Sequence, residues 1–473
     1  MSIATVERDP LITAIAEPLT RKVMTESRPR QRQAHLVEGA AGAQLFVVNG
    51  SRLYNLPPDL VAEFRAALGA PDDLALSRLL ASSGLLAPEA IDATPLAPMA
   101  PHALSLAIAQ KCNLGCTYCY AQQGTFGGTP KDMSLATATQ AIDLLLAAAP
   151  AGGKINIAFM GGEPLSNRKV LRAATSYAAT LATQRGVTAN FSITTNGTLL
   201  KPDDADFFEQ HGFAVTVSLD GSAEQHDRLR PFKGGKGSFE RIMARVSPLL
   251  EIQRRMQVSA RVTVTPFNLD LAPTLDLFVA MGFHSVGFSP LLRAPNGASE
   301  LGPDQLGDML EQMIACGLAF EQHVLRGTRY PFLNMVNALR ELERGTHRPY
   351  PCGAGAGYFG VSAEGEIAAC HRFVGDKLGQ FGTLDSGIDK QRQATWLTQR
   401  HVHTQQPCGD CWARYLCGGG CHHEVLERGR SACDYIRGWL HYTIQAHARL
   451  SRLAPGWFTH PDAAPTDPTV MLS

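Results

Sequence analysis

Ten of the 11 cysteines fall into two groups whose spacing suits metal chemistry. The first group is Cys112, Cys116 and Cys119, in the stretch KCNLGCTYCY. A 4Fe–4S cube has four irons, so three thiolate ligands leave one iron open to a small molecule. A zinc site with a distant fourth ligand is the alternative, although zinc-binding cysteines usually come as C-x2-C pairs.

The second group lies toward the C-terminal end of the sequence, and four of its members follow the spacing C-x2-C-x5-C-x3-C. The region is rich in Gly and poor in regular periodicity, so we expect it to need a metal-type staple to fold. Two structural zinc sites are the alternative to iron–sulfur clusters here. The group consists of Cys352, Cys370, Cys408, Cys411, Cys417, Cys421 and Cys433. The remaining thiol, Cys316, lies in an amphipathic stretch and is predicted to be a buried core residue.

Short polar motifs follow successive apolar runs downstream of the first group. Glycines at 161 and 162 allow close backbone approach to a ligand, and Glu163 can accept hydrogen bonds from an ammonium group. An Arg such as Arg230 can pair with a carboxylate through two parallel hydrogen bonds. The motifs are residues 160–164 (MGGEP), 194–197 (TTNG) and 218–221 (SLDG), followed by Arg230 and Leu292.

The elements that must position these motifs alternate between strand and helix. The helices predicted between the strands are 134–148, 166–185, 203–211 and 239–253. This order implies a parallel sheet that closes toward a partial barrel. In such barrels functional residues lie where strands end, which is where the motifs fall. The predicted strands are 104–109, 155–159, 191–194, 215–219, 258–264 and 285–288.

The rest of the chain divides by composition. AQLFVVNGSRLY predicts a hairpin that turns at Asn49-Gly50, and helical patterns at 59–67 and 74–80 complete a small winged-helix-like module. A Pro-rich linker, 86–102, follows it. The predicted domains are 1–95, 96–300 (the barrel), 301–350 (a helical bridge), 351–453 (the Cys-rich domain) and a loose tail, 454–473.

Composition excludes several classes of function. Lys plus Arg equals Asp plus Glu, at 43 each, so a nucleic acid is not expected as the main partner. No apolar run approaches the ~20 residues that span a bilayer, and the N-terminal stretch is a poor secretory signal. We therefore expect a cytoplasmic protein without a membrane partner, whose cysteines are not disulfides.

The first cysteine spacing, with Tyr118 before the last Cys, resembles the signature of the radical S-adenosylmethionine superfamily. The seven later cysteines resemble the C-terminal extension called SPASM. The resemblance implies a partial (β/α)6 barrel, S-adenosylmethionine, an electron donor such as flavodoxin or ferredoxin, and three 4Fe–4S clusters. It implies that Cys352, Cys370 and Cys421 hold an inner auxiliary cluster. The outer auxiliary cluster is then held by Cys408, Cys411, Cys417 and Cys433.

The same resemblance assigns contacts to S-adenosylmethionine. Segment 160–164 is expected to bind the amino group of the methionyl part, and Leu292 to pack near the adenosine. Ser218 and Arg230 match a cofactor-contacting pair in sulfatase-maturating enzymes. The complete predicted set is Tyr118, Gly161, Gly162, Glu163, Asn196, Ser218, Arg230 and Leu292.

The substrate is expected to be a polypeptide. The N-terminal module resembles precursor-peptide recognition elements, which bind a strand along a sheet edge, here at residues 46–48 and 52–54. Sulfatase-maturating enzymes have a catalytic Asp after the Cys that corresponds to Cys370, whereas this sequence has His371. That difference puts sulfatase maturation in doubt.

Nearly the whole chain resembles the maturation proteins of quinohemoprotein amine dehydrogenases. This implies thioether bonds between Cys sulfurs and Asp or Glu methylenes within the dehydrogenase small subunit. Asp220, at a strand end, is the predicted base; alternatively it shapes its turn or holds the ribose. Other interpretations are a sactipeptide-type thioether synthase, an anaerobic sulfatase maturase, or a zinc-stapled peptide-binding scaffold without catalysis.

Overall fold

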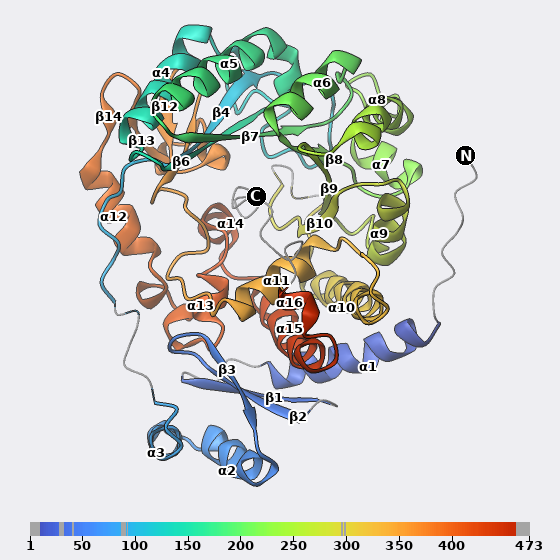
Figure 1. Cartoon of the computed structure of the whole chain (residues 1–473), viewed down its shortest axis with the longest axis vertical. Coiled ribbons are helices and arrows are strands. Elements are labelled where there is room, and N and C mark those ends of the chain that lie inside the picture. The colour runs from blue at the N-terminus through green and yellow to red at the C-terminus, as the bar shows by residue number, and fades with distance from the viewer. Residues whose placement is uncertain are drawn as a thin grey trace. The chain divides into compact units, whose positions relative to one another are not determined.

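The computed structural model describes residues 10–27, 33–39, 42–86, 91, 93–294, 297 and 299–459. These residues form two compact units (Figure 1). The barrel unit comprises Leu96–Leu301 and Gly353–Leu397. The terminal unit contains the described chain up to Pro95, Gly302–Cys352, and the described chain from Thr398 onward. The predicted boundaries near 95 and 300 coincide with unit boundaries, whereas the predicted Cys-rich domain, 351–453, is divided between the two units.

The barrel unit is built on a sheet whose strands run parallel over most of its width. Neighbouring strands follow the order β10-β9-β8-β7-β6-β4, so each strand lies beside the next one along this part of the chain. Helical crossovers allow this parallel arrangement, and the predicted radical S-adenosylmethionine α/β fold is confirmed. The strands are β4 (Ala103–Gln110), β6 (Lys154–Gly161), β7 (Thr188–Thr195), β8 (Ala214–Ser218), β9 (Gln257–Val264) and β10 (Ser285–Pro290).

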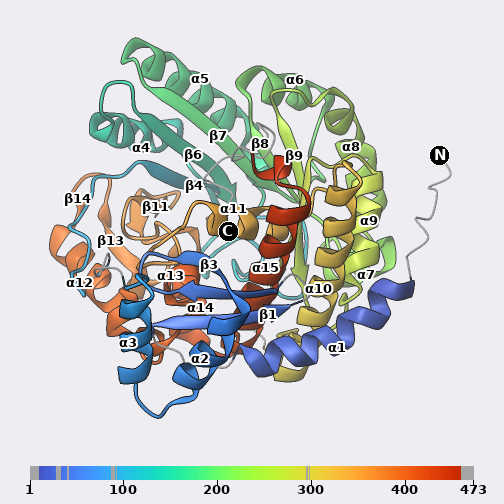
Figure 2. The ribbon, with the colours of Figure 1, turned by 60° about the horizontal axis from the view of Figure 1, so that its bottom comes forward.

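Helices cover the outer face of this sheet (Figures 1 and 2). Ser134 caps the first of them, because its hydroxyl accepts a hydrogen bond from the Thr137 amide at 3.0 Å. The strand residues that face the helices are apolar and fully buried, as in Ile155, Ile157 and Phe159 of β6. The helices are α4 (Leu135–Ala148), α5 (Arg168–Gln184), α6 (Pro202–His211), α8 (Phe239–Ile252) and α9 (Leu271–Ala280). The short helix α7 (Ala223–Leu229) was not predicted.

Part of the Cys-rich segment extends the barrel sheet beyond β4. Strand β11 (Tyr358–Val361) runs parallel to β4, and β12 (Glu366–Ala368), β13 (Gln380–Thr383) and β14 (Gly387–Ile388) continue the sheet antiparallel. The sequence analysis found no regular periodicity here. Strands of two to four residues are too short to show an alternating pattern. The short strand β5 (Lys131–Asp132) pairs with the C-terminal end of β4, whereas β11 pairs with its N-terminal half.

The terminal unit begins with a helix and a three-stranded antiparallel sheet. The predicted hairpin is confirmed as β2 (Gly42–Val47) and β3 (Arg52–Leu56), and the predicted helices as α2 (Pro58–Gly69) and α3 (Leu74–Ser82). The sequence analysis missed α1 (Pro10–Glu26) and β1 (Ala34–Gly39). Leu45, Val47 and Leu56 on one face of the sheet pack against Phe64 of α2 and two leucines of α3, Leu76 and Leu80.

The missed strand corrects one prediction. Phe46 pairs with His35 of β1 on one side and with Leu53 of β3 on the other. Residues 46–48 were predicted to offer a sheet edge, but β2 is the central strand, so the prediction is wrong for β2. Residues 52–54 do lie at an edge, because among the described strands β3 pairs only with β2.

Long helices form the core of the terminal unit around α15. Within it, Arg449 and the hydroxyl of Tyr442 both donate to the carboxylate of Glu321, at 2.7 Å. Cys316 of α10 is fully buried, as predicted. The helices are α10 (Pro303–Leu325), α11 (Leu333–Glu343) and α15 (Cys433–Leu453). Helices α10 and α15 pack on each other and on α1, and α11 packs on α15. Shorter helices are α13 (Arg414–Cys417), α14 (His422–Arg428) and α16 (Gly456–Thr459), while α12 (Lys390–Arg400) crosses the unit boundary.

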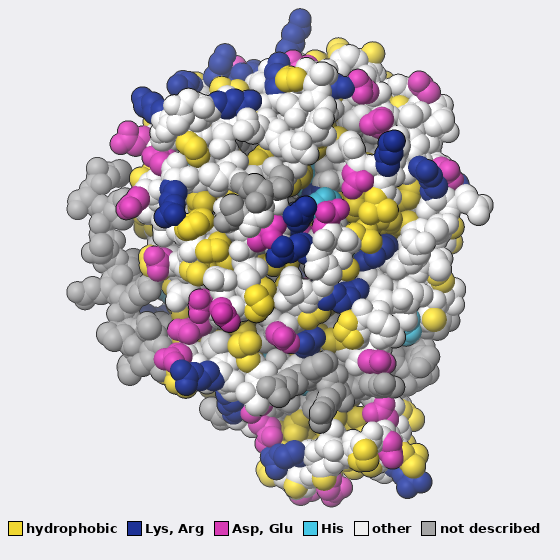
Figure 3. All heavy atoms as spheres, turned by 180° about the vertical axis from the view of Figure 1, so that it is seen from behind, with side chains coloured by type: hydrophobic (Ala, Val, Ile, Leu, Met, Phe, Trp, Pro, Cys, Tyr) yellow, Lys and Arg dark blue, Asp and Glu magenta, His cyan; other side chains and the backbone are white. Residues whose placement is uncertain are grey.

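The surface carries mixed charge, in keeping with the equal numbers of acidic and basic residues. Lys, Arg, Asp and Glu side chains are interspersed on the face that Figure 3 shows. None of the described helices has both the length and the apolar content needed to cross a bilayer. Of the predicted tail, residues 454–459 are described and include α16, and the remainder lies outside the described residues.

Two glycines of α10 give a matched test of this packing. A Cβ at Gly317 would lie 2.4 Å from Cε1 of Tyr442, whereas a Cβ at Gly307 would meet nothing within 4 Å. We expect Gly317→Ala to lower the free energy of unfolding by about 1–3 kcal/mol through overpacking. Gly307→Ala should raise it by about 0.5–1 kcal/mol, because Ala is the better helix former. Thermal unfolding of the two variants would measure both, and equal effects would contradict the packing.

Candidate active site

The first cysteine group lies in the loop that follows β4. This loop is fixed by the segment after α7: Leu114 bridges to Phe232, and the Gly115 amide donates to the Pro231 carbonyl at 2.8 Å. Burial raises the pKa of Cys116 to about 12, and the nearby thiols of Cys112 and Cys119 add to this rise. The structure therefore brings the three predicted thiols together. Burial raises the pKa of Cys112 as well as that of Cys116, and so favours the neutral form of these two unless a cation is present.

Three of the predicted residues meet beside these thiols. Asp220 is fully buried, and its Oδ2 accepts a hydrogen bond from the hydroxyl of Tyr118. That hydroxyl in turn accepts from Nη1 of Arg230, which lies 3.6 Å from Asp220 Oδ2. The other carboxylate oxygen accepts from the Thr263 amide of β9 at 3.0 Å. Burial raises the pKa of Asp220, and Arg230 and Tyr118 oppose that rise.

A buried histidine that the sequence analysis did not single out holds this arrangement. The Asp220 amide donates to Nδ1 of His226 at 3.2 Å, so the ring proton must be on Nε2, which lies 3.0 Å from Ser238 Oγ. Ser238 then donates to the Arg230 carbonyl at 2.7 Å. Burial lowers the pKa of His226 to about 3, so the ring stays neutral at physiological pH. A single His at the fourth position of a short helix gives no sequence signal of such a role.

The glycine motif at the end of β6 packs tightly against the cysteine loop. A Cβ at Gly161 would lie 2.3 Å from the Ala109 carbonyl oxygen, and one at Gly162 would lie 2.3 Å from that of Lys111. Neither position has room for a side chain, so these glycines allow β6 to approach the backbone that leads into Cys112. The glycines thus allow close packing against protein backbone, and their predicted approach to a bound cofactor stays a prediction.

Glu163 and Asn196 connect the ends of β6 and β7 to the cysteine loop. The buried carboxylate of Glu163 accepts from the amides of Leu165 (3.0 Å) and Asn196 (2.7 Å) and from Thr195 Oγ1 (2.8 Å). Burial raises the pKa of Glu163, and these bonds oppose the rise. Nδ2 of Asn196 donates to the sulfur of Cys112 at 3.6 Å. Hydrogen bonds to a ligand sulfur tune the reduction potential of a cluster.

The last two predicted contacts lie at neighbouring strand ends. Ser218 is the half-buried final residue of β8. Leu292, after β10, is 8% exposed, but the residue that packs with Tyr118 and Leu229 is its neighbour Leu291.

Alternate residues of the strands face the interior of the partial barrel, away from the helices. On β9, Val258, Ala260 and Val262 are fully buried, whereas the intervening residues are half-buried. Arg261 belongs to this inner face and lies in register with Ser218 of β8. Its partners in register are Ser218 of β8 and Gly287 of β10, and its neighbours on the same face of β9 are Ser259 and Thr263.

Arg261 was missed by the sequence analysis. The signal that could have found it is the alternation in QVSARVTV, which puts Arg among the polar positions of a half-buried strand. Burial lowers the pKa of Arg261 to about 10, so the side chain remains a cation near neutral pH.

Cys370 lies near the first cysteine group within the barrel unit. Both Cys119 and Cys370 contribute to the raised pKa of Tyr120, whose main cause is burial. The ring of Tyr120 meets the edge of His371 at a centroid distance of 6.0 Å, and Nδ1 of His371 lies 2.9 Å from the Tyr358 hydroxyl. The inner cysteine set stays a prediction, because its other members, Cys352 and Cys421, belong to the terminal unit.

The four cysteines of the predicted outer set gather in the terminal unit. Burial raises the pKa of Cys408 to about 12, and Cys411, Cys417 and Cys433 each contribute to that rise. Two arginines lie beside the set. Arg430 lowers the pKa of Cys408 and donates a hydrogen bond to the Gly419 carbonyl at 2.8 Å. Arg437 lowers the pKa of Cys433.

The residues present fit the implied cluster and cofactor. Nε of Arg230 is buried and has no hydrogen-bond partner among the described residues, which suits an anionic group still to be bound. Within the described chain, no three His, Cys, Asp or Glu side chains are placed to hold a single metal ion. In a 4Fe–4S cube each thiolate binds its own iron, so the thiolates need not share one ion.

Comparisons with known proteins agree with this site. The family model for the radical SAM superfamily matches residues 106–277. The serine-type anaerobic sulfatase-maturating enzyme of Klebsiella aerogenes is 28% identical over 367 residues, which cover 73% of this chain and 86% of that enzyme. The cysteine-type enzyme of Clostridium novyi (strain NT) is 30% identical over 333 residues, covering 66% of this chain and 84% of that enzyme.

A solved structure shares the fold. Native anSMEcpe with bound AdoMet superposes with a TM-score of 0.61 at 20% identity, covering 75% of this chain and all of that one. In this chain, the strands and helices of the shared fold carry the three thiols, the glycine motif and Arg230. The chain therefore belongs to the radical SAM superfamily, whose members combine S-adenosylmethionine with a 4Fe–4S cluster.

Proposed function

We propose that this enzyme forms thioether bonds within a polypeptide. It joins a Cys sulfur to an Asp or Glu methylene in the small subunit of a quinohemoprotein amine dehydrogenase. The observation that carries the proposal is the position of Arg261, a cation of β9 that lies in register with Ser218 of β8, one of the residues proposed to contact the cofactor. Such a cation suits a substrate whose reacting carbon is next to a carboxylate.

The first cysteine group would hold the cluster, with Cys112, Cys116 and Cys119 as its ligands. When bound, the cluster and S-adenosylmethionine supply a carbon radical that removes a hydrogen atom from an unactivated carbon. The unpartnered Nε of Arg230 would bind the methionyl carboxylate, with Ser218 beside it. Tyr118, Gly161, Gly162, Glu163, Asn196 and Leu292 complete the proposed cofactor site.

Asp220 remains the proposed base, but its surroundings support a positioning role, which differs from the predicted alternatives of shaping its turn or holding the ribose. The carboxylate is fully buried and already binds Tyr118 and the Thr263 amide, beside Arg230. In that role Asp220 orients Tyr118 and Arg230 at the cysteine loop, and another group takes the thiol proton.

Substrate recognition is proposed for the N-terminal sheet. Strand β3 is an edge strand of the described sheet, so an extended peptide can add beside residues 52–56. A flavodoxin or ferredoxin is the proposed electron donor. Cys352, Cys370 and Cys421 are the proposed ligands of an inner auxiliary cluster, and the proposed ligands of an outer one are Cys408, Cys411, Cys417 and Cys433.

Sulfatase maturation is the second candidate, because both relatives described above carry that activity in their names. Against it, His371 stands where the resemblance expects the catalytic Asp, and its ring is hydrogen-bonded to the Tyr358 hydroxyl. Mass spectrometry of a co-expressed small subunit tests the two. Each thioether removes two hydrogens from the substrate, whereas formylglycine in a co-expressed sulfatase would favour the second candidate.

Replacing Cys112, Cys116 and Cys119 together with Ala should remove about four of about 12 irons per chain. Cleavage of S-adenosylmethionine should stop, because no open iron remains to bind it. Iron and sulfide analysis after anaerobic purification measures the loss. Cys316→Ala is the control and should keep all the iron. Stoichiometric zinc without iron in the native protein would instead support the zinc-stapled scaffold.

His226→Ala should weaken S-adenosylmethionine binding about thirty-fold while leaving the iron content unchanged. The reason is the loss of two hydrogen bonds, each worth about 1 kcal/mol, which position Asp220 and Arg230. Gln at this position can accept and donate in the same way, so His226→Gln should bind nearly normally. Equal binding by the Ala variant and the native enzyme would show that His226 does not position the site.

Arg261→Met should reduce binding of the native substrate at least about ten-fold, because a buried charge pair is lost. Substrate with Asn or Gln at the reacting position should bind the native enzyme and Arg261→Met equally. Binding of S-adenosylmethionine, whose own carboxylate is the other possible partner, should not change. If cofactor affinity falls and peptide affinity stays constant, Arg261 serves the cofactor and the proposed carboxylate recognition is wrong.

A further inference from the structure

We infer that the N-terminal sheet has a second role besides peptide recognition: it builds the site of the outer auxiliary cluster. The inference rests on the proposed function for the existence of that cluster. It concerns the face of the sheet opposite α2 and α3. All of the residues involved belong to the terminal unit.

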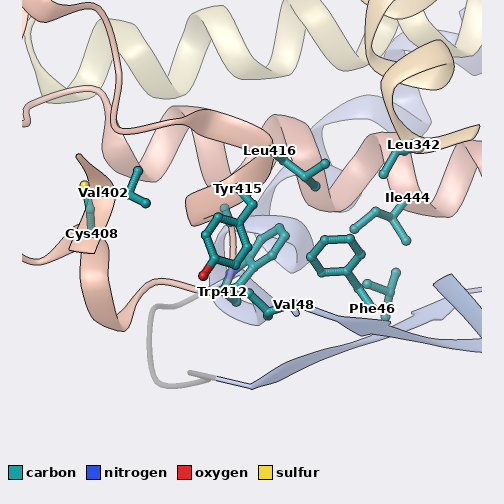
Figure 4. Packing of buried hydrophobic residues seen from close by; sticks show 11 residues of the cluster. Phe46, Val48, Leu342, Val402, Cys408, Trp412, Tyr415, Leu416 and Ile444 are labelled. Atoms are coloured by element: carbon teal, nitrogen blue, oxygen red, sulfur yellow. The ribbon is translucent and has the colours of Figure 1, made fainter. Parts of the chain in front are cut away.

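This face of the sheet shares one hydrophobic core with the loop that carries the outer cysteines. Phe46 and Val48 pack with Trp412 and Tyr415 (Figure 4). Cys408 belongs to the same core and is 7% exposed. The loop around these cysteines has only short helical turns, of three and four residues. Packing against the sheet, rather than secondary structure, therefore holds the loop in place.

Trp412 is the main connection, because it follows Cys411 directly and is fully buried. Its ring stacks on His35 of β1, with a centroid distance of 3.8 Å and an interplanar angle of 6°. Phe46 of β2 meets the same ring edge-on at 6.1 Å. The indole Nε1 donates to the Ser27 carbonyl, just after α1, at 3.1 Å. Three N-terminal elements thus fix the residue beside one cluster ligand.

The sheet also holds the helix that begins with the fourth ligand, Cys433. His35 Nε2 lies 2.8 Å from Nδ1 of His441 on α15, and both rings are fully buried. Gln445, one turn further along α15, donates to the Glu38 carbonyl of β1 at 3.2 Å. Strand β1 therefore contacts the supports of both Cys411 and Cys433, and it fixes the distance between them.

This arrangement predicts that deletion of residues 1–95 affects the iron content as well as substrate binding. A module that only recognised peptide could be removed without loss of iron. Here its removal would expose Trp412 and separate α15 from the cysteine loop. The truncated chain should therefore lose about four irons as well as substrate binding.

Two phenylalanines give a matched test on the full chain. Phe46 and Phe64 are 1% and 0% exposed, and they pack in the cores on opposite faces of the same sheet. Phe46→Ala should lose about four of about 12 irons and the outer-cluster signal in electron paramagnetic resonance. Phe64→Ala removes the same ring from the other face and should keep all three clusters. The cluster on Cys112, Cys116 and Cys119 should respond to S-adenosylmethionine in both variants.

The inference is overturned if both variants keep all the iron, or if both lose the same amount. If Phe46→Ala does not fold, Phe46→Leu should still alter the outer-cluster spectrum while leaving that of the barrel cluster unchanged. A native protein with about four irons would show that the outer cluster does not exist, and part of the proposed function would fail with it. A native protein with about 12 irons, together with an unaffected Phe46→Ala variant, would overturn only this inference.

Discussion

The structure of the barrel depends on one constraint, which is that three half-buried thiols must be held together at the end of β4. Burial disfavours the thiolate that a metal requires, so the surroundings have to supply positive charge and hydrogen bonds. Arg230 supplies the charge and lowers the pKa of Cys116, against the larger effect of burial. Asn196 supplies a hydrogen bond to Cys112.

Much of the rest follows from keeping Arg230 in place. Its side chain is fixed through Tyr118 and Asp220, and its backbone through Ser238 and His226. Asp220 in turn is bound to the backbone of β9. The ends of β4, β8 and β9 and the helix α7 are therefore joined by one buried polar network. Its hydrogen bonds offset the desolvation of its members, apart from Nε of Arg230.

The sequence was most informative where the signal is local. The spacing of Cys112, Cys116 and Cys119 and the alternation of strands and helices predicted the barrel and the place of its site. Non-local features were out of reach. The pairing of Asp220 with Arg230 depends on how α7 folds back, and β11 joins the barrel sheet from more than two hundred residues beyond β4. The error over residues 46–48 has the same origin, because β1 was not recognised and β2 was left with an apparent edge.

In the proposed function, the barrel that many enzymes share carries the radical chemistry. Specificity for the substrate depends on a few side chains of this chain, chiefly Arg261 and His371. The most direct test is to deuterate the Asp and Glu methylenes of the substrate and follow the label. We predict that deuterium from these methylenes appears in 5′-deoxyadenosine in step with loss of two hydrogens per new bond. Label transferred instead from a Cys or Ser Cβ, with formylglycine in the product, would contradict the account.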